Sequence, residues 1–213
     1  MANLQELYPA VVRGDAKTTR TLTEQALKAG IDPITLVNEH LVPAMDEVGR
    51  RFETNEYFVP ELLLSARAMK AGLELIRPLL VARGDEPIGR VAIGTVKGDL
   101  HDIGKNLVAS LLEGGGFEVF DLGVNVAPEK FIESIKEKKA NIVAMSALLT
   151  TTMPSMKTTI EALKAAGVRE QVKVLIGGAP ITQQYADAIG ADGYSENAVG
   201  AVALAKKVAA VTA

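Results

Sequence analysis

The stretch RVAIGTV at residues 90–96, together with the loop KGDLHDIG at residues 97–104, decides the fold. A short apolar run rich in β-branched residues predicts a buried strand, and the glycines that follow mark its end. From residue 104 to residue 113 the apolar spacing becomes helical. The segment therefore predicts a strand, a loop and a helix, which is the repeating unit of a parallel α/β sheet.

The same alternation continues toward the C-terminus. Predicted strands cover residues 117–122, 142–146 and 172–176, with a weak one near 193–194, and predicted helices cover residues 128–138, 154–166, 182–189 and 198–211. Five such units predict a doubly wound parallel sheet of the flavodoxin or Rossmann-like type. Ligands of such sheets bind beyond the carboxyl ends of the strands, where the strand order reverses. The loops at 97–104 and 147–152 are therefore the candidate site.

The first 86 residues have helical periodicity only. We expect Asp15 to cap a helix that ends at Gly30, Asp32 and Pro33 to begin the next, and Pro43 to break or kink it. A fourth helix from Pro60 carries one apolar stripe, formed by Leu62, Ala66, Met69, Leu73, Ile76 and Leu80. Residues 82–87 lose this period and contain Gly and Pro. The pattern predicts a helical domain at 1–86 and an α/β domain at 87–213.

Composition excludes several classes of function. The net charge of −3 provides no basic field for nucleic acid. The chain has no cysteine, so disulfides, thiolate metal sites and cysteine nucleophiles are excluded. No run approaches the roughly 20 apolar residues of a membrane span, and the start, MANLQE, does not resemble a signal peptide. We therefore expect a cytoplasmic protein without membrane or nucleic-acid partners.

The loop at 97–104 contains the chemistry. An imidazole such as that of His101 is a good ligand for a transition metal, and a carboxylate such as Asp99 can fix its tautomer. Gly98 and Gly104 leave room for a bulky ligand near the backbone. Read without a family, the residues equally fit a surface loop whose polar side chains cap the next helix. One histidine with two aspartates offers few ligands for a mononuclear zinc or iron site.

A family resemblance rests on this loop. Asp99-x-His101-x-x-Gly104 resembles the Asp-x-His-x-x-Gly signature of the cobalamin-binding domains of methionine synthase, corrinoid methyltransferase proteins and certain mutases. The string GDLHDIGKNLV at 98–108 is similar to the methyltransferase branch in particular. Other stretches resemble the same family and extend the likeness over nearly the whole chain: SALLTTT at 146–152, GGAP at 177–180, LVPAMDEVG at 41–49 and FVPE at 58–61.

The resemblance implies a bound cobalamin, such as methylcobalamin, in the base-off form with His101 as the lower axial ligand of cobalt. Asp99 would accept the other N–H of the imidazole and Thr152 would extend this relay, although the family often has Ser there. Ser146 would meet the displaced nucleotide tail. The implied cofactor-binding residues are Gly98, Asp99, Leu100, His101, Asp102, Ile103, Gly104, Ser146, Leu148, Thr150, Thr152, Gly177 and Gly178.

The resemblance also implies a function. The chain would carry a methyl group on cobalt from a substrate:corrinoid methyltransferase to a second methyltransferase, whose acceptor is a pterin or thiol, and a reductive activase would rescue oxidised cobalt. It would not be catalytic alone. The helical half would cover the methyl face through Phe58, Leu62 and Met69, although an ordinary bundle core fits these residues equally well. The alternatives are the small subunit of a mutase, which usually lacks the helical half, and a corrinoid-dependent regulator, which would add a basic DNA-binding domain.

Overall fold

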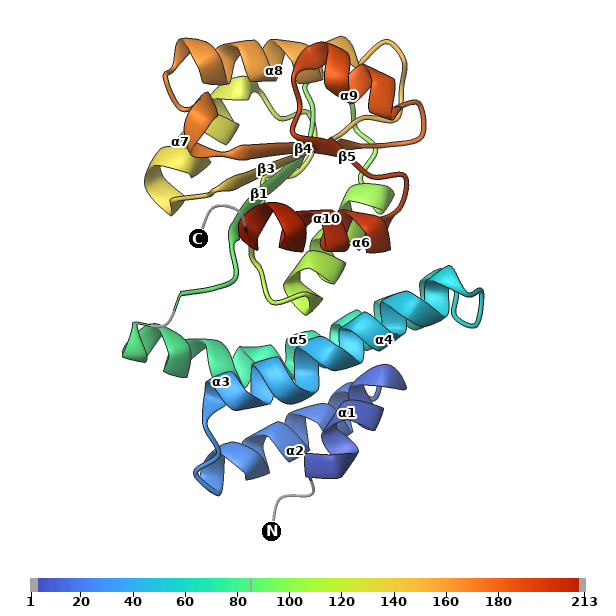
Figure 1. Cartoon of the computed structure of the whole chain (residues 1–213), viewed down its shortest axis with the longest axis vertical. Helices are drawn as coiled ribbons and strands as arrows, with labels where there is room; N and C mark the ends of the chain where they lie inside the picture. Colours follow the sequence, from blue (N-terminus) through green and yellow to red (C-terminus); the bar gives the residue numbers. More distant parts are fainter. Residues whose placement is uncertain (1–3, 85, 211–213) are drawn as a thin grey trace. The chain divides into compact units, whose positions relative to one another are not determined.

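The computed structural model describes residues 4–84 and 86–210. The first three residues of the sequence, Asp85 in the predicted linker and Val211 at the predicted end of the last helix lie outside the described residues. Contacts divide the chain into two compact units, residues 1–87 with 113–116 and residues 88–112 with 117–213 (Figure 1). We call them the helical unit and the α/β unit and describe each by itself.

The helical unit is built from amphipathic helices with recognisable start signals. The Asp15 carboxylate accepts from the amide of Thr18 and Asp32 accepts from the amide of Ile34, so both predicted caps are present. The predicted apolar stripe on the last helix is buried at Leu62, Ala66, Met69, Leu73 and Ile76. The helices are α1 (Leu4–Val12), α2 (Ala16–Lys28), α3 (Pro33–Thr35), a π-helix (Leu36–Leu41), α4 (Val42–Glu53) and α5 (Val59–Arg83).

The chain does not break at Pro43, contrary to one alternative that the sequence suggested. It remains helical from Pro33 to Glu53, and the turn before Pro43 is the π-helix Leu36–Leu41. A proline lacks the N–H of the usual bond and its ring crowds the carbonyl four residues earlier. A wider turn accommodates both effects, because its hydrogen bonds span five residues instead of four.

The α/β unit contains a parallel sheet in the order β2-β1-β3-β4-β5. The order reverses between β1 and β3, as the predicted flavodoxin-like topology requires. The strands are β1 (Arg90–Thr95), β2 (Glu118–Asp121), β3 (Ile142–Ser146), β4 (Lys173–Gly177) and β5 (Gly193–Tyr194). The helices are α6 (Ile103–Gly114), α7 (Pro128–Lys138), α8 (Pro154–Ala165), a 3₁₀ turn (Arg169–Gln171), α9 (Gln183–Ile189) and α10 (Ala198–Ala210).

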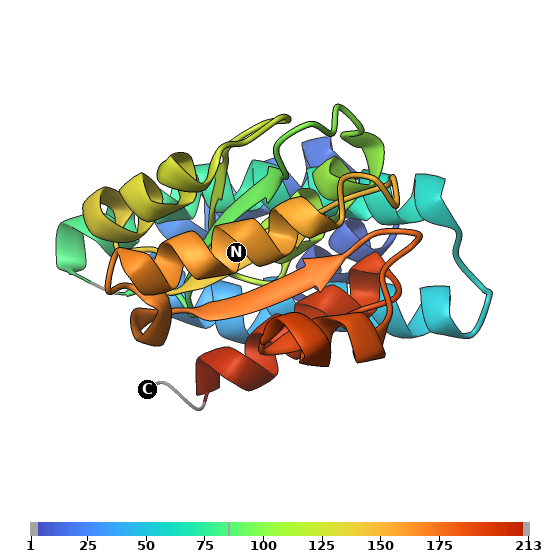
Figure 2. The same ribbon diagram turned by 90° about the horizontal axis from the view of Figure 1, so that it is seen from above.

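Helices cover both faces of this sheet, with α7, α8 and α9 on one side and α6 and α10 on the other (Figures 1 and 2). Each face of the sheet therefore has its own core. Because side chains alternate along a strand, Val143 and Met145 of β3 belong to the core under α7, α8 and α9, while Ile142 and Ala144 belong to the core under α6 and α10. Burial on both faces explains the nearly continuous apolar runs in the sequence. No helix in the described part of the chain is long and apolar enough to cross a membrane.

Candidate functional site

The site lies at the carboxyl ends of β1 and β3. These strands are neighbours, with Thr95 opposite Ser146, so the loops that follow them meet at one edge of the sheet. The first loop supplies Asp99 and His101 and the second supplies Thr152, 53 residues away from Asp99 in the chain. The topology thus brings together the three residues of the predicted relay.

The carboxylate of Asp99 is fully buried and accepts hydrogen bonds on both oxygens. Its Oδ1 accepts from the amide of His101 at 3.0 Å and lies 2.8 Å from Nδ1 of the same residue. Its Oδ2 accepts from the amide of Leu148 at 2.8 Å and from the hydroxyl of Thr152 at 2.7 Å. Asp99 therefore ties the loop after β1 to the loop after β3.

Asp99 is ionised despite its burial. Burial acts to raise the pKa of Asp99, but hydrogen bonds from the Thr152 hydroxyl and from the amides of His101 and Leu148 outweigh it and lower this pKa below its ordinary value. An ionised carboxylate only accepts, so Nδ1 of the imidazole must donate. In a neutral imidazole this leaves a lone pair on Nε2, which is the state that binds a metal.

His101 itself is held by its backbone and open at its side chain. The hydroxyl of Thr95 donates to the carbonyl of His101 at 2.8 Å, while 51% of the imidazole side chain is exposed. The ring is therefore fixed in tautomer and position and still accessible to a ligand.

Asn125, which the sequence analysis missed, also holds the loop at 97–104 in place. It lies in the loop after β2 with a positive φ of 53°, and its amide donates to the carbonyl of Asp99 at 2.9 Å. Its side-chain oxygen accepts from the amide of Gly98 at 2.8 Å. Asn tolerates the left-handed conformation better than most residues, which is the only sequence signal that this position offered.

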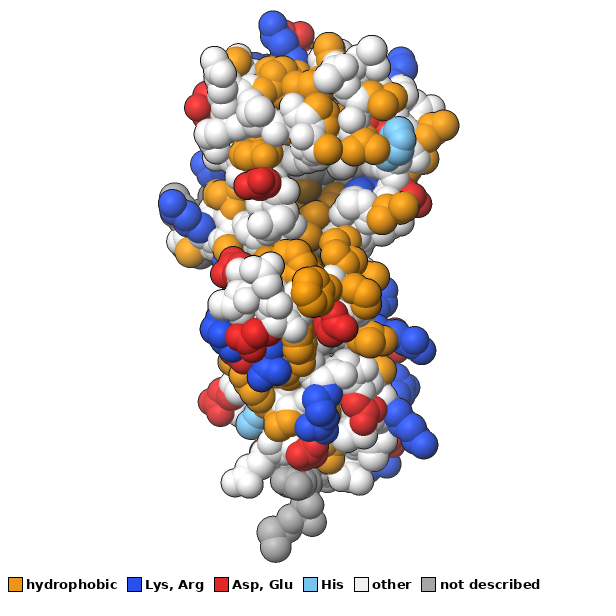
Figure 3. Space-filling view, turned by 90° about the vertical axis from the view of Figure 1, so that its right-hand side faces the viewer, with side chains coloured by type: hydrophobic (Ala, Val, Ile, Leu, Met, Phe, Trp, Pro, Cys, Tyr) orange, Lys and Arg blue, Asp and Glu red, His pale blue; other side chains and the backbone are white. Residues whose placement is uncertain are grey.

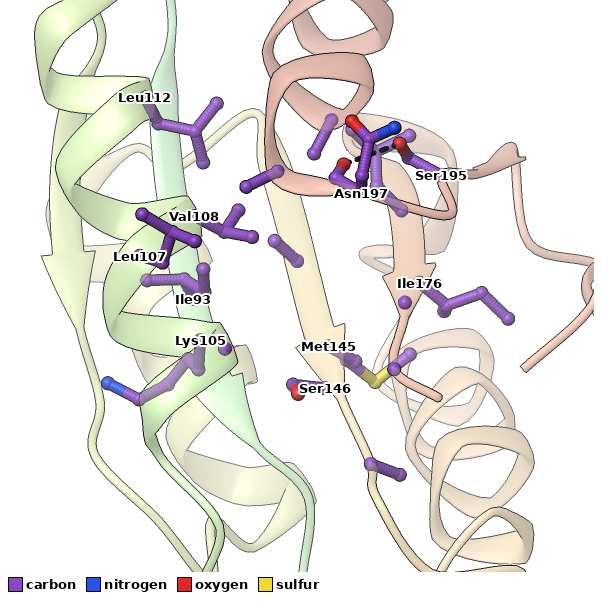
Figure 4. Close-up of a pocket in the computed structure, with 18 of the residues that line it drawn as sticks. Ile93, Lys105, Leu107, Val108, Leu112, Met145, Ser146, Ile176, Ser195 and Asn197 are labelled. Atoms are coloured by element: carbon purple, nitrogen blue, oxygen red, sulfur yellow. Dashed lines mark hydrogen bonds between the residues drawn. The ribbon is translucent and has the colours of Figure 1, made fainter. Parts of the chain in front are cut away.

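Lys105 is a second residue that the sequence analysis missed. Its side chain is only 2% exposed, and the ammonium group lies 2.5 Å from Oδ2 of Asp121 at the end of β2. Figure 4 shows this side chain directed away from the space between α6 and β3. A buried cation needs such a partner, so the pair ties the start of α6 to β2.

A cavity of about 580 Å³ opens beside His101 and extends between the sheet and the helices α6 and α10 (Figure 4). Its size is typical of sites for small ligands, which measure about 300–1,000 Å³. The predicted residues that line it are Leu100, His101, Asp102, Ile103, Gly104, Ser146, Leu148, Gly177 and Gly178. Gly98, Asp99, Thr150 and Thr152 are not among the residues that line it; Asp99 and Thr152 act behind His101, and Thr150 is exposed.

Two glycines of the site are needed for different reasons. A Cβ at Gly104 would meet no atom within 4 Å, so this glycine keeps space open beside the cavity. Gly178 has a φ of 129°, and a Cβ there would lie 1.9 Å from the carbonyl oxygen of Ala147. Gly178 is therefore required by the close packing of two loops.

Exposed apolar side chains lie close in sequence to His101 and in the loop after β3. Ile103 is 85% exposed and Leu100 is 71% exposed, and Leu148 and Leu149 are also exposed in the facing loop. Figure 3 shows hydrophobic side chains on the surface of this unit. Exposed residues of this kind, gathered in one place, mark a binding surface.

The predicted contact of Phe58, Leu62 and Met69 with the cofactor is partly wrong. Leu62 and Met69 are buried in the core of the bundle and are not available to a ligand, because they belong to the stripe that packs α5 against its neighbours. Phe58, just before α5, is 60% exposed, and Val59, Leu63, Leu64, Leu79 and Val81 of α5 are also exposed. The exposed apolar side chains near the start of α5 are therefore Phe58, Val59, Leu63 and Leu64.

His101 and Asp99 suit a metal ion that is already coordinated by a cofactor when it binds. Within residues 4–84 and 86–210, no three His, Asp or Glu side chains gather to hold a metal ion. A single imidazole with a buried carboxylate behind it suits a metal in a macrocycle, and the apolar rim and cavity suit the rest of such a cofactor. The residues present therefore fit a corrinoid.

The comparisons with known proteins agree with this geometry. Two models described as B12 binding domain match residues 89–203 and residues 4–77. Among solved structures, a cobalamin-binding protein from Desulfitobacterium hafniense is 31% identical with a TM-score of 0.78, covering 97% of this chain and 98% of that one. The methanol:cobalamin methyltransferase complex from Methanosarcina barkeri contains a chain that is 30% identical with a TM-score of 0.85, covering 97% and 79%.

Curated relatives are more similar still. Trimethylamine corrinoid protein 2 of Methanosarcina mazei is 47% identical over 199 residues, which are 92% of this chain and 91% of that protein. Dimethylamine corrinoid protein of Methanosarcina barkeri is 44% identical over 209 residues, which are 97% of each chain. This chain therefore belongs to the family of B12-binding corrinoid proteins that serve methyltransferase systems.

Proposed function

We propose that this chain carries a methyl group on a corrinoid that is bound through His101, between a substrate-specific methyltransferase and a second methyltransferase. The buried contacts of Asp99 carry the proposal, because they hold Nδ1 of His101 against the carboxylate and leave Nε2 free for a metal. When bound, the corrinoid supplies a cobalt centre that accepts a methyl group and gives it up. The chain has no catalytic role alone.

The residues behind His101 control its strength as a ligand. Asp99 holds the Nδ1 proton and thereby increases the electron density on Nε2, and Thr152 in turn holds Asp99. Movement of a proton along these three groups would change how strongly the imidazole donates. The relay would thus adjust how strongly His101 binds the cobalt of the corrinoid.

The cavity beside His101 would hold the nucleotide tail, which leaves the metal when His101 takes its place. Ser146 at the end of β3, Leu148 in the loop that follows it and Gly177 at the end of β4 lie along it, and Gly104 keeps its side open. The apolar rim formed by Leu100, Ile103, Leu148 and Leu149 would pack on the flat ring and exclude water from the axial bond.

The helical unit would serve as a cap over the opposite face of the corrinoid, with Phe58, Leu63 and Leu64 as its contacts. The relatives named for trimethylamine and dimethylamine favour a methylated amine as the donor on the first methyltransferase. A reductive activase would complete the system, since a corrinoid whose cobalt has been oxidised must be reduced before it can accept a methyl group again.

Electron paramagnetic resonance of the cobalt(II) form tests the axial ligand. Protein labelled with ¹⁵N only in histidine is reconstituted with hydroxocobalamin and reduced by one electron. We expect the threefold splitting of a ¹⁴N ligand to become the twofold splitting of ¹⁵N.

The two histidines give a matched pair for this experiment. His101→Ala should abolish the twofold splitting, and His40→Ala should retain it, because His40 lies in the π-helix of the helical unit. A threefold splitting in the labelled wild type would mean that the tail base keeps its bond to cobalt, and would overturn ligation by His101.

A further inference from the structure

The inner part of the cavity contains no polar side chain, unlike its mouth. The Lys105 ammonium pairs with Asp121, and the other polar side chains that line the cavity lie at a strand end or in the loops after the strands: His101, Asp102, Ser146, Ser195, Glu196 and Asn197. The remaining side chains that line it are all apolar. Figure 4 shows Val108 and Leu112 of α6 directed toward β3. The inner wall consists of Val91, Ile93, Val108, Leu112, Ile142, Ala144, Leu175, Ala201, Leu204 and Ala205.

Backbone groups offer no substitute for the missing polar side chains. The strands β1 and β3 are paired on both edges, so their amides and carbonyls are used within the sheet. The backbones of α6 and α10 are used within the helices. At the mouth, the Ser195 hydroxyl donates to the carbonyl of Asn197 and the side-chain oxygen of Asn197 accepts from the amide of Gly200, so the Ser195 proton and this oxygen are used within their own loop.

Three small residues create the space. Ala144 of β3 and Ala201 and Ala205 of α10 all line the cavity, where larger side chains would reduce its volume. The space is therefore a slot with flat apolar walls between a sheet and two helices. A planar, largely hydrocarbon group fits such a slot.

We propose that this slot selects corrinoids by their tail base, accepting an apolar aromatic base of the benzimidazole type and disfavouring a purine such as adenine. This selection rests on the proposed function, which places the displaced tail in the cavity. Both kinds of base bring the ring nitrogen that would otherwise bind cobalt. Adenine brings an exocyclic amine and two further ring nitrogens as well, and the inner wall has no partner for them.

The size of the effect follows from the chemistry of the wall. A polar group buried without a partner is disfavoured, yet an apolar pocket rejects a polar analogue less strongly than a hydrogen-bonding pocket rejects an apolar one. We therefore expect the corrinoid with an adenine base to bind about 10- to 100-fold more weakly than the one with dimethylbenzimidazole.

Calorimetric titration of the purified full chain tests the selection with three probes. These are cobalamin with its dimethylbenzimidazole tail, the corresponding corrinoid with an adenine tail, and cobinamide, which lacks the tail. We expect cobalamin to bind most tightly. Equal binding of the two tailed corrinoids, or tighter binding of the adenine form, would overturn the selection and leave the proposed function standing. Failure of all three to bind would overturn the proposed function itself.

Variants of the slot locate the effect. Ala201→Leu should fill the slot and weaken cobalamin binding about tenfold or more, with the affinity for cobinamide unchanged. Ala203→Leu is the matched control, because Ala203 is exposed on the same helix and should alter neither affinity. An equal loss for cobalamin and cobinamide in Ala201→Leu would refute the placement of the tail in this slot.

A second pair of variants tests the same wall without any increase in side-chain size. Val108→Thr keeps the shape of the wall and adds a hydroxyl, so it should reduce the preference for cobalamin over the adenine form several-fold. Val202→Thr is its control, since Val202 packs against the same core outside the cavity. An unchanged preference in Val108→Thr would contradict selection by this wall.

Discussion

Asp99 in the α/β unit and Glu47 in the helical unit are both carboxylates with several donors, yet their surroundings differ. Asp99 is fully buried and accepts from backbone amides, a hydroxyl and an imidazole. Glu47 is 20% exposed and accepts from the guanidinium groups of Arg50 and Arg51, at 2.8–2.9 Å. Both groups have lowered pKa values, so the direction of the shift alone does not distinguish them.

The difference lies in what each carboxylate holds in place. The partners of Glu47 are flexible, partly exposed side chains from the same helix, and water can replace them. The partners of Asp99 belong to two loops that are far apart in the chain, and water has no access to the carboxylate. A buried carboxylate whose donors come from two distant loops therefore holds a site together, whereas a partly exposed one with donors from its own helix stabilises only that helix.

The largest expected effect is the loss of the buried carboxylate. Asp99→Ala removes the acceptor of the backbone amides of His101 and Leu148, while the Thr152 hydroxyl keeps the carbonyl of Leu149 as an acceptor. Each buried donor without a partner costs roughly 1–3 kcal/mol, so we expect the free energy of unfolding of the cofactor-free chain to fall by about 3 kcal/mol. Urea unfolding at pH 7 measures it.

Asp102→Ala is the control for this change, since Asp102 is an exposed carboxylate in the same loop. We expect it to alter the free energy of unfolding by under about 1 kcal/mol. Similar losses for the two variants would show that Asp99 does not tie the two loops together.

A smaller effect is expected at Asn125. Asn125→Ala removes the acceptor for the amide of Gly98 and places a Cβ-bearing residue without a polar side chain at a φ of 53°. Together these should lower the free energy of unfolding by about 1–2 kcal/mol. Asn125→Gly relieves the backbone cost and should lose less, and Asn125→Asp keeps the acceptor. If all three variants matched the wild type in urea unfolding, Asn125 would have no bracing role.

The sequence predicted the framework well because its signals are local. Strands and helices of the α/β unit begin and end within one or two residues of the predicted positions, since β-branched runs, glycines and prolines act on their own neighbours. Where a local rule failed, at Pro43, a π-helical turn absorbed the proline. The two candidate loops followed from topology before any contact was known.

The contacts of the site were harder to predict from residues alone. That Thr152 meets Asp99 was implied by a family resemblance, since no spacing in the chain relates two loops 53 residues apart. Asn125 was missed because its role depends on a left-handed backbone and on contacts with Gly98, which leave no periodic signal. The apolar stripe itself indicated that Leu62 and Met69 are core residues, and the structure confirms this reading.

The smallest expected effect is at Glu47, and pH and salt reveal its origin. Hydrogen bonds from Arg50 and then Arg51 lower the pKa of Glu47 to about 2, so its stabilising contribution is complete above the ordinary carboxyl range and is lost as the pH falls toward 2. The difference in unfolding free energy between wild type and Glu47→Gln should therefore be small at pH 7 and decrease below a pH of about 4.5.

Salt separates the two carboxylates directly. One molar sodium chloride reduces the Debye length to about 3 Å and should abolish the Glu47→Gln difference, while the Asp99→Ala difference should persist because neutral donors in a buried site are not screened. Urea unfolding of both variants at low and high salt measures this. If the Asp99→Ala difference also vanished in salt, the carboxylate would be held by long-range charge, and the distinction between the two regions would fail.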